Sequence, residues 1–167
     1  MSFQKSGISF FVLFLVFYFN SIETYSQDKV LEVGEELKYE VSFGFIKLGY
    51  INFKLSGSRK EGKKTIYNSK LEVKTYPEVP FIKLNEIFES EMEFSEEGLF
   101  SRKFYETAFK DKSITRTDYK FNYKEDFVKM FQETDGEISA DKKISIKDNV
   151  LYKDEICWHY GARINSF

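Results

Sequence analysis

The residues best suited to chemistry in this chain are three neighbours, Cys157, Trp158 and His159, which are its only cysteine, tryptophan and histidine. A thiol beside an imidazole could form a nucleophile pair or supply two ligands to a metal ion. Both roles require the side chains to converge, yet residues i and i+2 of a helix point about 200° apart. We therefore interpret the three residues as part of a helix that packs on a sheet.

The segment 76–84 is the second candidate site, because it carries both prolines of the protein and five large apolar side chains in a connection between strands. These five are the candidate contacts for a ligand or a partner: Tyr76, Val79, Phe81, Ile82 and Leu84. Connecting loops are usually polar and exposed. Two interpretations stay open: the segment caps one end of the sheet as core, or it forms an apolar lip over a ligand cavity or an interaction patch.

Motifs of the common enzyme classes are absent from the sequence, which has no glycine-rich phosphate loop, no HExxH and no GxSxG. We therefore expect no enzyme, no catalytic residue, no metal site and no cofactor. Rows of charge do occur, with Lys70, Glu72 and Lys74 on one segment and alternating glutamates over 89–93 on another. We interpret them as cross-strand pairs on a solvated sheet face rather than as a carboxylate cluster.

The elements that must position these residues are strands, because apolar and polar side chains alternate along most of the chain. The alternation predicts strands over 35–43, 51–55, 65–75, 86–94, 99–109, 113–123 and 127–133, with a weaker eighth around Ile144 and Ile146. From Asp154, a plausible N-cap, the spacing becomes helical through Ile156, Tyr160 and Arg163. The expected fold is mainly β: a curved antiparallel meander, a partial barrel or half-barrel, with one short C-terminal helix packed on it.

The first 26 residues read as a secretory signal peptide. Lys5 precedes an uncharged apolar run over 8–19, and small residues follow before an expected cut at Ser26–Gln27. The run has 12 residues, whereas a spanning helix needs about 20. We expect a single β-rich domain over 27–167, without a transmembrane or lipid anchor, that is exported and periplasmic, associated with the cell envelope, or secreted.

Charge argues against two classes of partner. The chain has 25 basic and 27 acidic residues, a net charge of −2, and no basic face is visible in the sequence. Nucleic-acid binding and strong attraction to anionic lipid both need such a face, so neither is expected.

Three segments of the chain form an ordered set: a strand, bend and strand over 34–49 (GEELKYEVSFGFIKLG), a strand over 86–90 and a helix over 154–163. They resemble the opening signature, the mid-domain strand and the helix of an exported bacterial family, the domain of unknown function 3108. The resemblance implies this architecture and compartment but no established activity. Family members usually have serine at the position of Cys157 and continue with further strands, so we expect the sequence to be a fragment lacking C-terminal strands.

The functional expectation is an exported, non-enzymatic protein of a Gram-negative envelope whose curved sheet holds a hydrophobic or cell-surface ligand, a lipid or a glycan. The alternative is an interaction module that docks another envelope protein through a sheet edge or through the apolar loop 76–84.

Overall fold

The computed structural model describes residues 31–80 and 83–164. The predicted signal peptide over 1–26 lies outside the described residues, as do two of the candidate contacts, Phe81 and Ile82. Among the described residues, no helix combines the length and the apolar character needed to cross a membrane.

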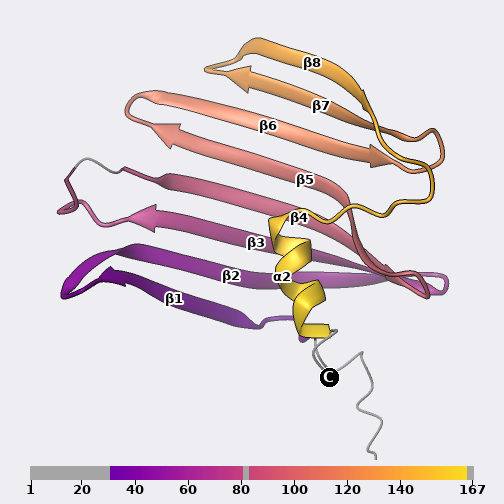
Figure 1. Ribbon diagram of the computed structural model, residues 1–167, viewed down its shortest axis with the longest axis horizontal. Helices are drawn as coiled ribbons and strands as arrows, with labels where there is room; N and C mark the ends of the chain where they lie inside the picture. The colour runs from indigo at the N-terminus through magenta and orange to yellow at the C-terminus, as the bar shows by residue number, and fades with distance from the viewer. Residues whose placement is uncertain (1–30, 81–82, 165–167) are drawn as a thin grey trace, which may run out of the picture.

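The described chain forms one antiparallel sheet of eight strands, in which each strand pairs with the next along the sequence. The strands are β1 (Glu36–Phe43), β2 (Ile46–Glu61), β3 (Lys64–Thr75), β4 (Asn85–Ser95), β5 (Gly98–Lys110), β6 (Ser113–Asn122), β7 (Phe127–Thr134) and β8 (Glu137–Ser145), followed by helix α2 (Glu155–Ile164). Figure 1 shows β1 and β8 at opposite edges, so the sheet is one open, uncurled layer. The prediction of a mainly β antiparallel meander with a short C-terminal helix on it is confirmed. The expected curvature into a partial barrel or half-barrel is not found, because β1 and β8 stay apart and the sheet is uncurled.

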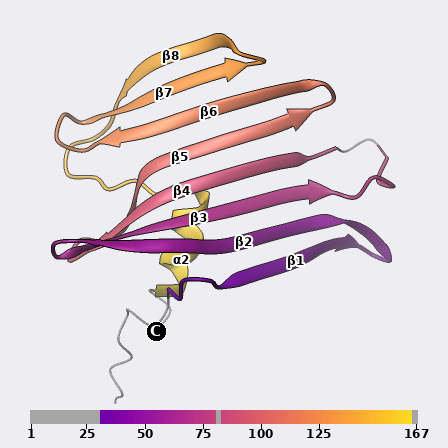
Figure 2. The same ribbon diagram turned by 180° about the vertical axis from the view of Figure 1, so that it is seen from behind.

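One face of the sheet becomes apolar because the register aligns apolar side chains across neighbouring strands. Phe53 pairs with Leu71, and Leu71 pairs in turn with Phe88. Because side chains alternate between faces, these partners all project to the same side. This is the side that α2 covers, and Figure 2, seen from behind, shows the opposite face without a helix.

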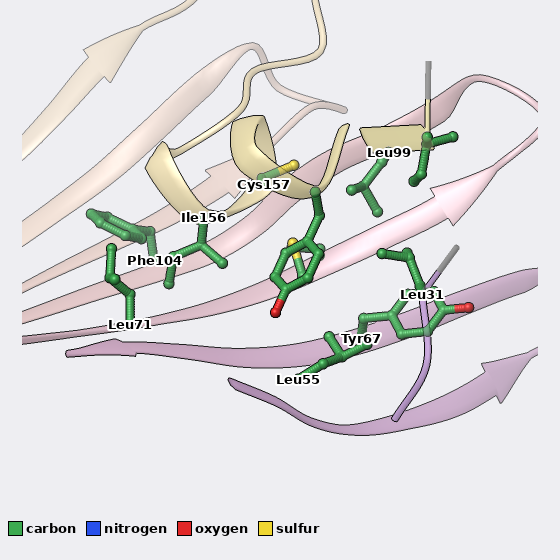
Figure 3. Packing of buried hydrophobic residues seen from close by; sticks show 11 residues of the cluster. Leu31, Leu55, Tyr67, Leu71, Leu99, Phe104, Ile156 and Cys157 are labelled. Atoms are coloured by element: carbon green, nitrogen blue, oxygen red, sulfur yellow. The ribbon is translucent and has the colours of Figure 1, made fainter. Parts of the chain in front are cut away.

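Helix α2 closes the core over β3, β4 and β5. Its residues Ile156, Cys157 and Tyr160 have no exposed surface, and they pack against sheet residues that include Leu71 and Phe104 (Figure 3). Burying an aliphatic or aromatic side chain contributes about 1.5–3 kcal/mol each. The helix therefore fixes the sheet from β5 to the β1 edge, where Arg163 pairs with Glu35, while β6, β7 and β8 extend beyond it (Figure 1).

The eighth strand differs from the sequence-based expectation. It runs from Glu137 to Ser145, beginning well before the apolar pair Ile144 and Ile146 that indicated it. Almost every residue of β8 is exposed on both faces, so the strand has no buried side to impose an apolar alternation.

Candidate functional site

The Cys157–His159 segment does not form a reactive pair. Cys157 lies in the core with no exposed surface, where burial raises the pKa of its thiol to about 12. Trp158 is 67% exposed, and the His159 ring stacks on Phe53 with 4.1 Å between ring centroids. Their divergence follows from the helical spacing, and no group of described His, Cys, Asp and Glu side chains is arranged to hold a metal.

The loop 76–84 combines features of both interpretations. Val79 is buried at 7% exposure, whereas Leu84 is 41% exposed. Tyr76 ties the loop to the β1–β2 hairpin: its backbone N–H donates to the Leu48 carbonyl at 2.9 Å, and its hydroxyl donates to Glu40 at 3.4 Å. The described part of the loop therefore caps the end of the sheet and still leaves an apolar side chain in solvent.

Sequence reasoning missed the tip of the β1–β2 hairpin, which lies beside this loop at the same end of the sheet (Figure 1). Gly44 adopts a φ of +58° in the two-residue turn, and the adjacent Phe45 is fully exposed. Phe43 is 77% and Ile46 is 60% exposed. We call Phe43, Phe45, Ile46 and Leu84 the apolar end; exposed large apolar groups gathered in this way are typical of contact surfaces.

The charged rows pair only in part as expected. Lys70 lies opposite Glu89, but Glu91 and Glu93 lie opposite Asn68 and Ile66. The side chains of Glu91 and Glu93 are 13% and 8% exposed, so they are not solvated. They are neutralised instead by basic residues from β2, β3 and β5: Arg59, Lys64, Arg102 and Lys103.

The helix-side face of the sheet beyond α2 is mixed in character. Glu106 lies there half-buried, and burial raises the pKa of its carboxyl, with the charges of Glu86 and Glu155 adding to the rise. Thr117 beside it is 2% exposed. This part of the face therefore combines carboxylates and hydroxyls with apolar groups.

A fork in the sheet creates a further candidate site. The β4–β5 register shifts between Glu91 and Met92, which leaves Arg102 as the extra residue of a β-bulge. Strand β6 pairs with β5 only from Lys103 onward, so 98–102 stays with β4 alone. Figure 1 shows this part of β5 bending away from β6 toward the β2–β3 hairpin.

A buried polar network holds the fork open. The backbone N–H of Ser101 donates to the Tyr152 carbonyl at 2.9 Å, and the Tyr123 hydroxyl donates to the Ser101 carbonyl at 2.6 Å. The Asp154 N–H donates to the Ser101 hydroxyl at 2.7 Å, and the Ser90 hydroxyl donates to the Asp154 carboxylate at 2.6 Å. Burial raises the pKa of Tyr123 well above its usual range, so its hydroxyl keeps its proton. The start of α2 is thereby tied to the bulge.

An open cleft of about 600 Å³ lies at the fork, and we call it the fork cleft. Five basic side chains line it: Lys64, Arg102, Lys120, Lys124 and Lys129. The lining also includes two carboxylates, Glu93 and Glu97, and four aromatic rings, Phe100, Phe121, Tyr123 and Phe127. Lys64 and Arg102 contact the buried glutamates. Within the described residues, Lys120 and Lys124 have no carboxylate within ion-pair distance.

Lys120 also belongs to a row of four lysines, which we call the lysine row: Lys103, Lys120, Lys129 and Lys143 occupy directly opposed positions on β5, β6, β7 and β8. Three of them have an acidic neighbour: Lys103 lies 3.3 Å from Glu91, Lys129 3.8 Å from Asp141, and Lys143 3.8 Å from Glu125. Like charges at opposed positions destabilise a sheet. Acidic neighbours therefore offset the repulsion at three positions of the lysine row, and among the described residues Lys120 is the position left without one.

These features define the chain as a β-meander domain with a cationic cleft at a fork in its sheet. Comparison of the sequence and the structure with known proteins finds no matching family model, no similar curated protein and no similar solved structure.

Proposed function

We propose that this protein is a non-enzymatic binding domain of the Gram-negative cell envelope, and that its fork cleft binds a phosphate-bearing saccharide headgroup of the cell surface. The observation that carries this proposal is Lys120, a cation without an acidic partner among the described residues, which lies in the cleft between two further lysines. The export signal over 1–26 and the relation to the domain of unknown function 3108 family are parts of the same proposal.

The physical argument begins with charge. The whole chain carries a net charge of −2, yet the cleft gathers five basic side chains against two acidic ones. A bound phosphate would accept hydrogen bonds from several ammonium groups at once, and such charge-assisted bonds are about twice as strong as neutral ones. Its charge would also relieve the repulsion within the lysine row.

The aromatic rings favour a ligand with a saccharide part over a bare ion. Phe121, Tyr123 and Phe127 are half-buried at the cleft, so each offers part of its ring surface. Ligand sites typically combine apolar walls with a few polar groups that fix orientation. The cleft has this composition, whereas the helix-side face carries the acidic groups Glu86 and Glu106, which would repel a phosphate.

The test is calorimetric titration of the purified mature protein with fructose bisphosphate, with glucose as the neutral comparison. The double variant K120S/K124S should bind fructose bisphosphate about tenfold more weakly, the equivalent of about 1.4 kcal/mol. The matched control is K112S, which removes an exposed lysine from the β5–β6 turn at the other end of the strands. Equal losses in both variants, or no binding by the native protein in any arm, would refute the proposal.

A second arm separates the two sources of the phosphate. Vesicles of phosphatidylglycerol present it on a lipid, and vesicles of phosphatidylcholine control for membrane attachment without net negative charge. Lysine-dependent binding to phosphatidylglycerol alone identifies a lipid headgroup, whereas lysine-dependent binding to fructose bisphosphate as well identifies the free phosphosugar chemistry.

The second candidate function is docking of another envelope protein through the apolar end. The observation that favours it is the full exposure of Phe45, beside Phe43 at 77%. A photo-crosslinking amino acid at position 45 should then give one defined protein adduct in cells, and the same group at position 112 should not.

A further inference from the structure

Strand β1 presents an unprotected backbone edge. The Glu35 carbonyl accepts a hydrogen bond from the Leu55 N–H at 3.0 Å, so Glu35 faces β2. Because the peptide groups of a strand alternate in direction, the backbone groups of every second residue point away from β2. These residues are Glu36, Lys38, Glu40 and Ser42, and no described strand pairs with them.

The other edge of the sheet is protected against pairing. Strand β8 carries consecutive charges at Asp141, Lys142 and Lys143, so both of its faces are charged. Its pairing with β7 is also interrupted by a register shift between Gln132 and Glu133. Charged faces and bulges are the usual means of blocking edge-to-edge association. On β1, the positions 36–41 pair with β2 without interruption, and charges occupy only one face.

We propose that β1 pairs antiparallel with β1 of a second copy of this chain, around a two-fold axis at Tyr39. In this register Lys38 lies opposite Glu40 of the second copy, and Glu40 lies opposite its Lys38. Leu37 lies opposite Val41 on the other face. The outward backbone groups of Lys38 then exchange hydrogen bonds with those of Glu40 in the second copy. Tyr39 lies opposite Tyr39 of the second copy in a non-hydrogen-bonded pair.

Charge selects this register from its neighbours. Moving the axis to Lys38 places two lysines opposite each other, and moving it to Glu40 places two glutamates opposite each other. Opposed like charges destabilise a sheet, whereas opposed unlike charges stabilise it. The two-fold axis makes each of these contacts occur twice, as an interface between two identical surfaces requires.

The apolar side of β1 suits the same arrangement. Tyr39 is 47% and Val41 is 38% exposed. The Tyr39 ring packs edge-on against Phe53 and His159, with centroids 6.2 and 6.5 Å away, so its position on the helix-side face is set by the core. Two copies would cover these side chains mutually. This association does not depend on the fork cleft, which lies across the sheet between β5 and β6.

The test is site-specific disulfide formation. Residues of a non-hydrogen-bonded pair have Cα atoms about 4.5 Å apart, within the range that a disulfide spans. Y39C should therefore yield a covalent dimer on mild oxidation. V41C is the matched control: position 41 is on the same face with similar exposure, but two copies of it would lie about 13 Å apart, four residues along the strand. Cys157 is fully buried and should not contribute.

Sedimentation of the native protein and of charge variants completes the test, with far-UV circular dichroism to verify that each variant folds. The native protein should dimerise with rising concentration, K38E should dimerise about tenfold more weakly, and K38E/E40K should regain the native affinity. A native protein that stays monomeric, equal cross-linking of Y39C and V41C, or a double variant as weak as K38E would each overturn the proposal.

Discussion

Replacing Asp154 with alanine should loosen helix α2 from the sheet, because this carboxylate joins the start of the helix to strand β4. One of its oxygens accepts from the Cys157 backbone N–H at 2.9 Å and so caps the helix. The other accepts from the Ser90 hydroxyl on β4 at 2.6 Å. Asp154 and Ser90 are 9% and 3% exposed, so solvent cannot readily replace either bond.

The expected loss of unfolding free energy is about 3 kcal/mol. Removing an N-cap side chain costs about 1 kcal/mol. Removing the charged acceptor of a buried hydroxyl adds about 2 kcal/mol, since the Ser90 hydroxyl is left without its partner. Small domains are stabilised by only about 5–15 kcal/mol in total, so the loss is large and measurable.

Urea unfolding provides the assay, followed by far-UV circular dichroism and by the fluorescence of Trp158, the one tryptophan of the chain. With a slope of about 2 kcal/mol per molar urea, the midpoint of D154A should fall by about 1.5 M. A double-mutant cycle with S90A then isolates the Ser90–Asp154 bond, for which we expect a coupling of about 1.5 kcal/mol.

The matched control is the Ser113–Asp135 bond, which has a similar length of 2.9 Å but is exposed. Its coupling should be far smaller than that of the buried bond, because water competes for both partners. If S90A and D154A proved additive, or if the two cycles gave equal couplings, burial would not be what makes the Asp154 contact strong, and the reasoning would fail.

Two further predictions concern the sheet and the core. A Cβ at Gly49 would collide with the Lys74 carbonyl oxygen on the neighbouring strand, whereas a Cβ at Gly57 would meet nothing within 4 Å. In urea unfolding, G49A should therefore lose about 2 kcal/mol or more of unfolding free energy, and G57A less than half of that. Equal losses in the two variants would contradict the close approach of the backbones at Gly49. Burial raises the pKa of Cys157 to about 12, above the roughly 8.5 of an unfolded thiol, so the stability that this thiol contributes is complete below about pH 8.5 and is lost as the pH rises toward 12. Under reducing conditions, the unfolding free energy should fall between pH 8 and pH 10.5 by about 2 kcal/mol more in the native protein than in C157S. Parallel plots of unfolding free energy against pH for the two proteins would show that the thiol does not titrate in this way.

Several elements could be predicted from the sequence because their causes are local. Alternation along 65–75 and 86–94 identifies β3 and β4, and the opposed positions of Lys70 and Glu89 follow from pairing them as a hairpin. Asp154 precedes α2 as its N-cap, as its position before the helical spacing indicates. Local spacing also separates Cys157 from His159, since residues two apart on a helix diverge.

The fork cleft could not be predicted, because its causes are not local. Arg102 reads as an ordinary strand residue, and only the register of β4 against β5 makes it a bulge. Glu91 and Glu93 read as solvated charges, yet arginines from β2 and β5 enclose them. Nothing in the sequence around Lys120 indicates that Lys103 and Lys143, which lie far from it along the chain, belong to the same row of opposed positions.

The positions of the strands, the start of the helix and the side chains that share a face can therefore be read from the chain alone. Each of these follows from periods of 2 and 3.6 residues that act within one segment. The charges that lie opposite one another, the point where the sheet divides and the edge that stays open are set by the folded arrangement of the strands. Those properties depend on the register between segments, and a shift of one residue sends every side chain of a strand to the other face.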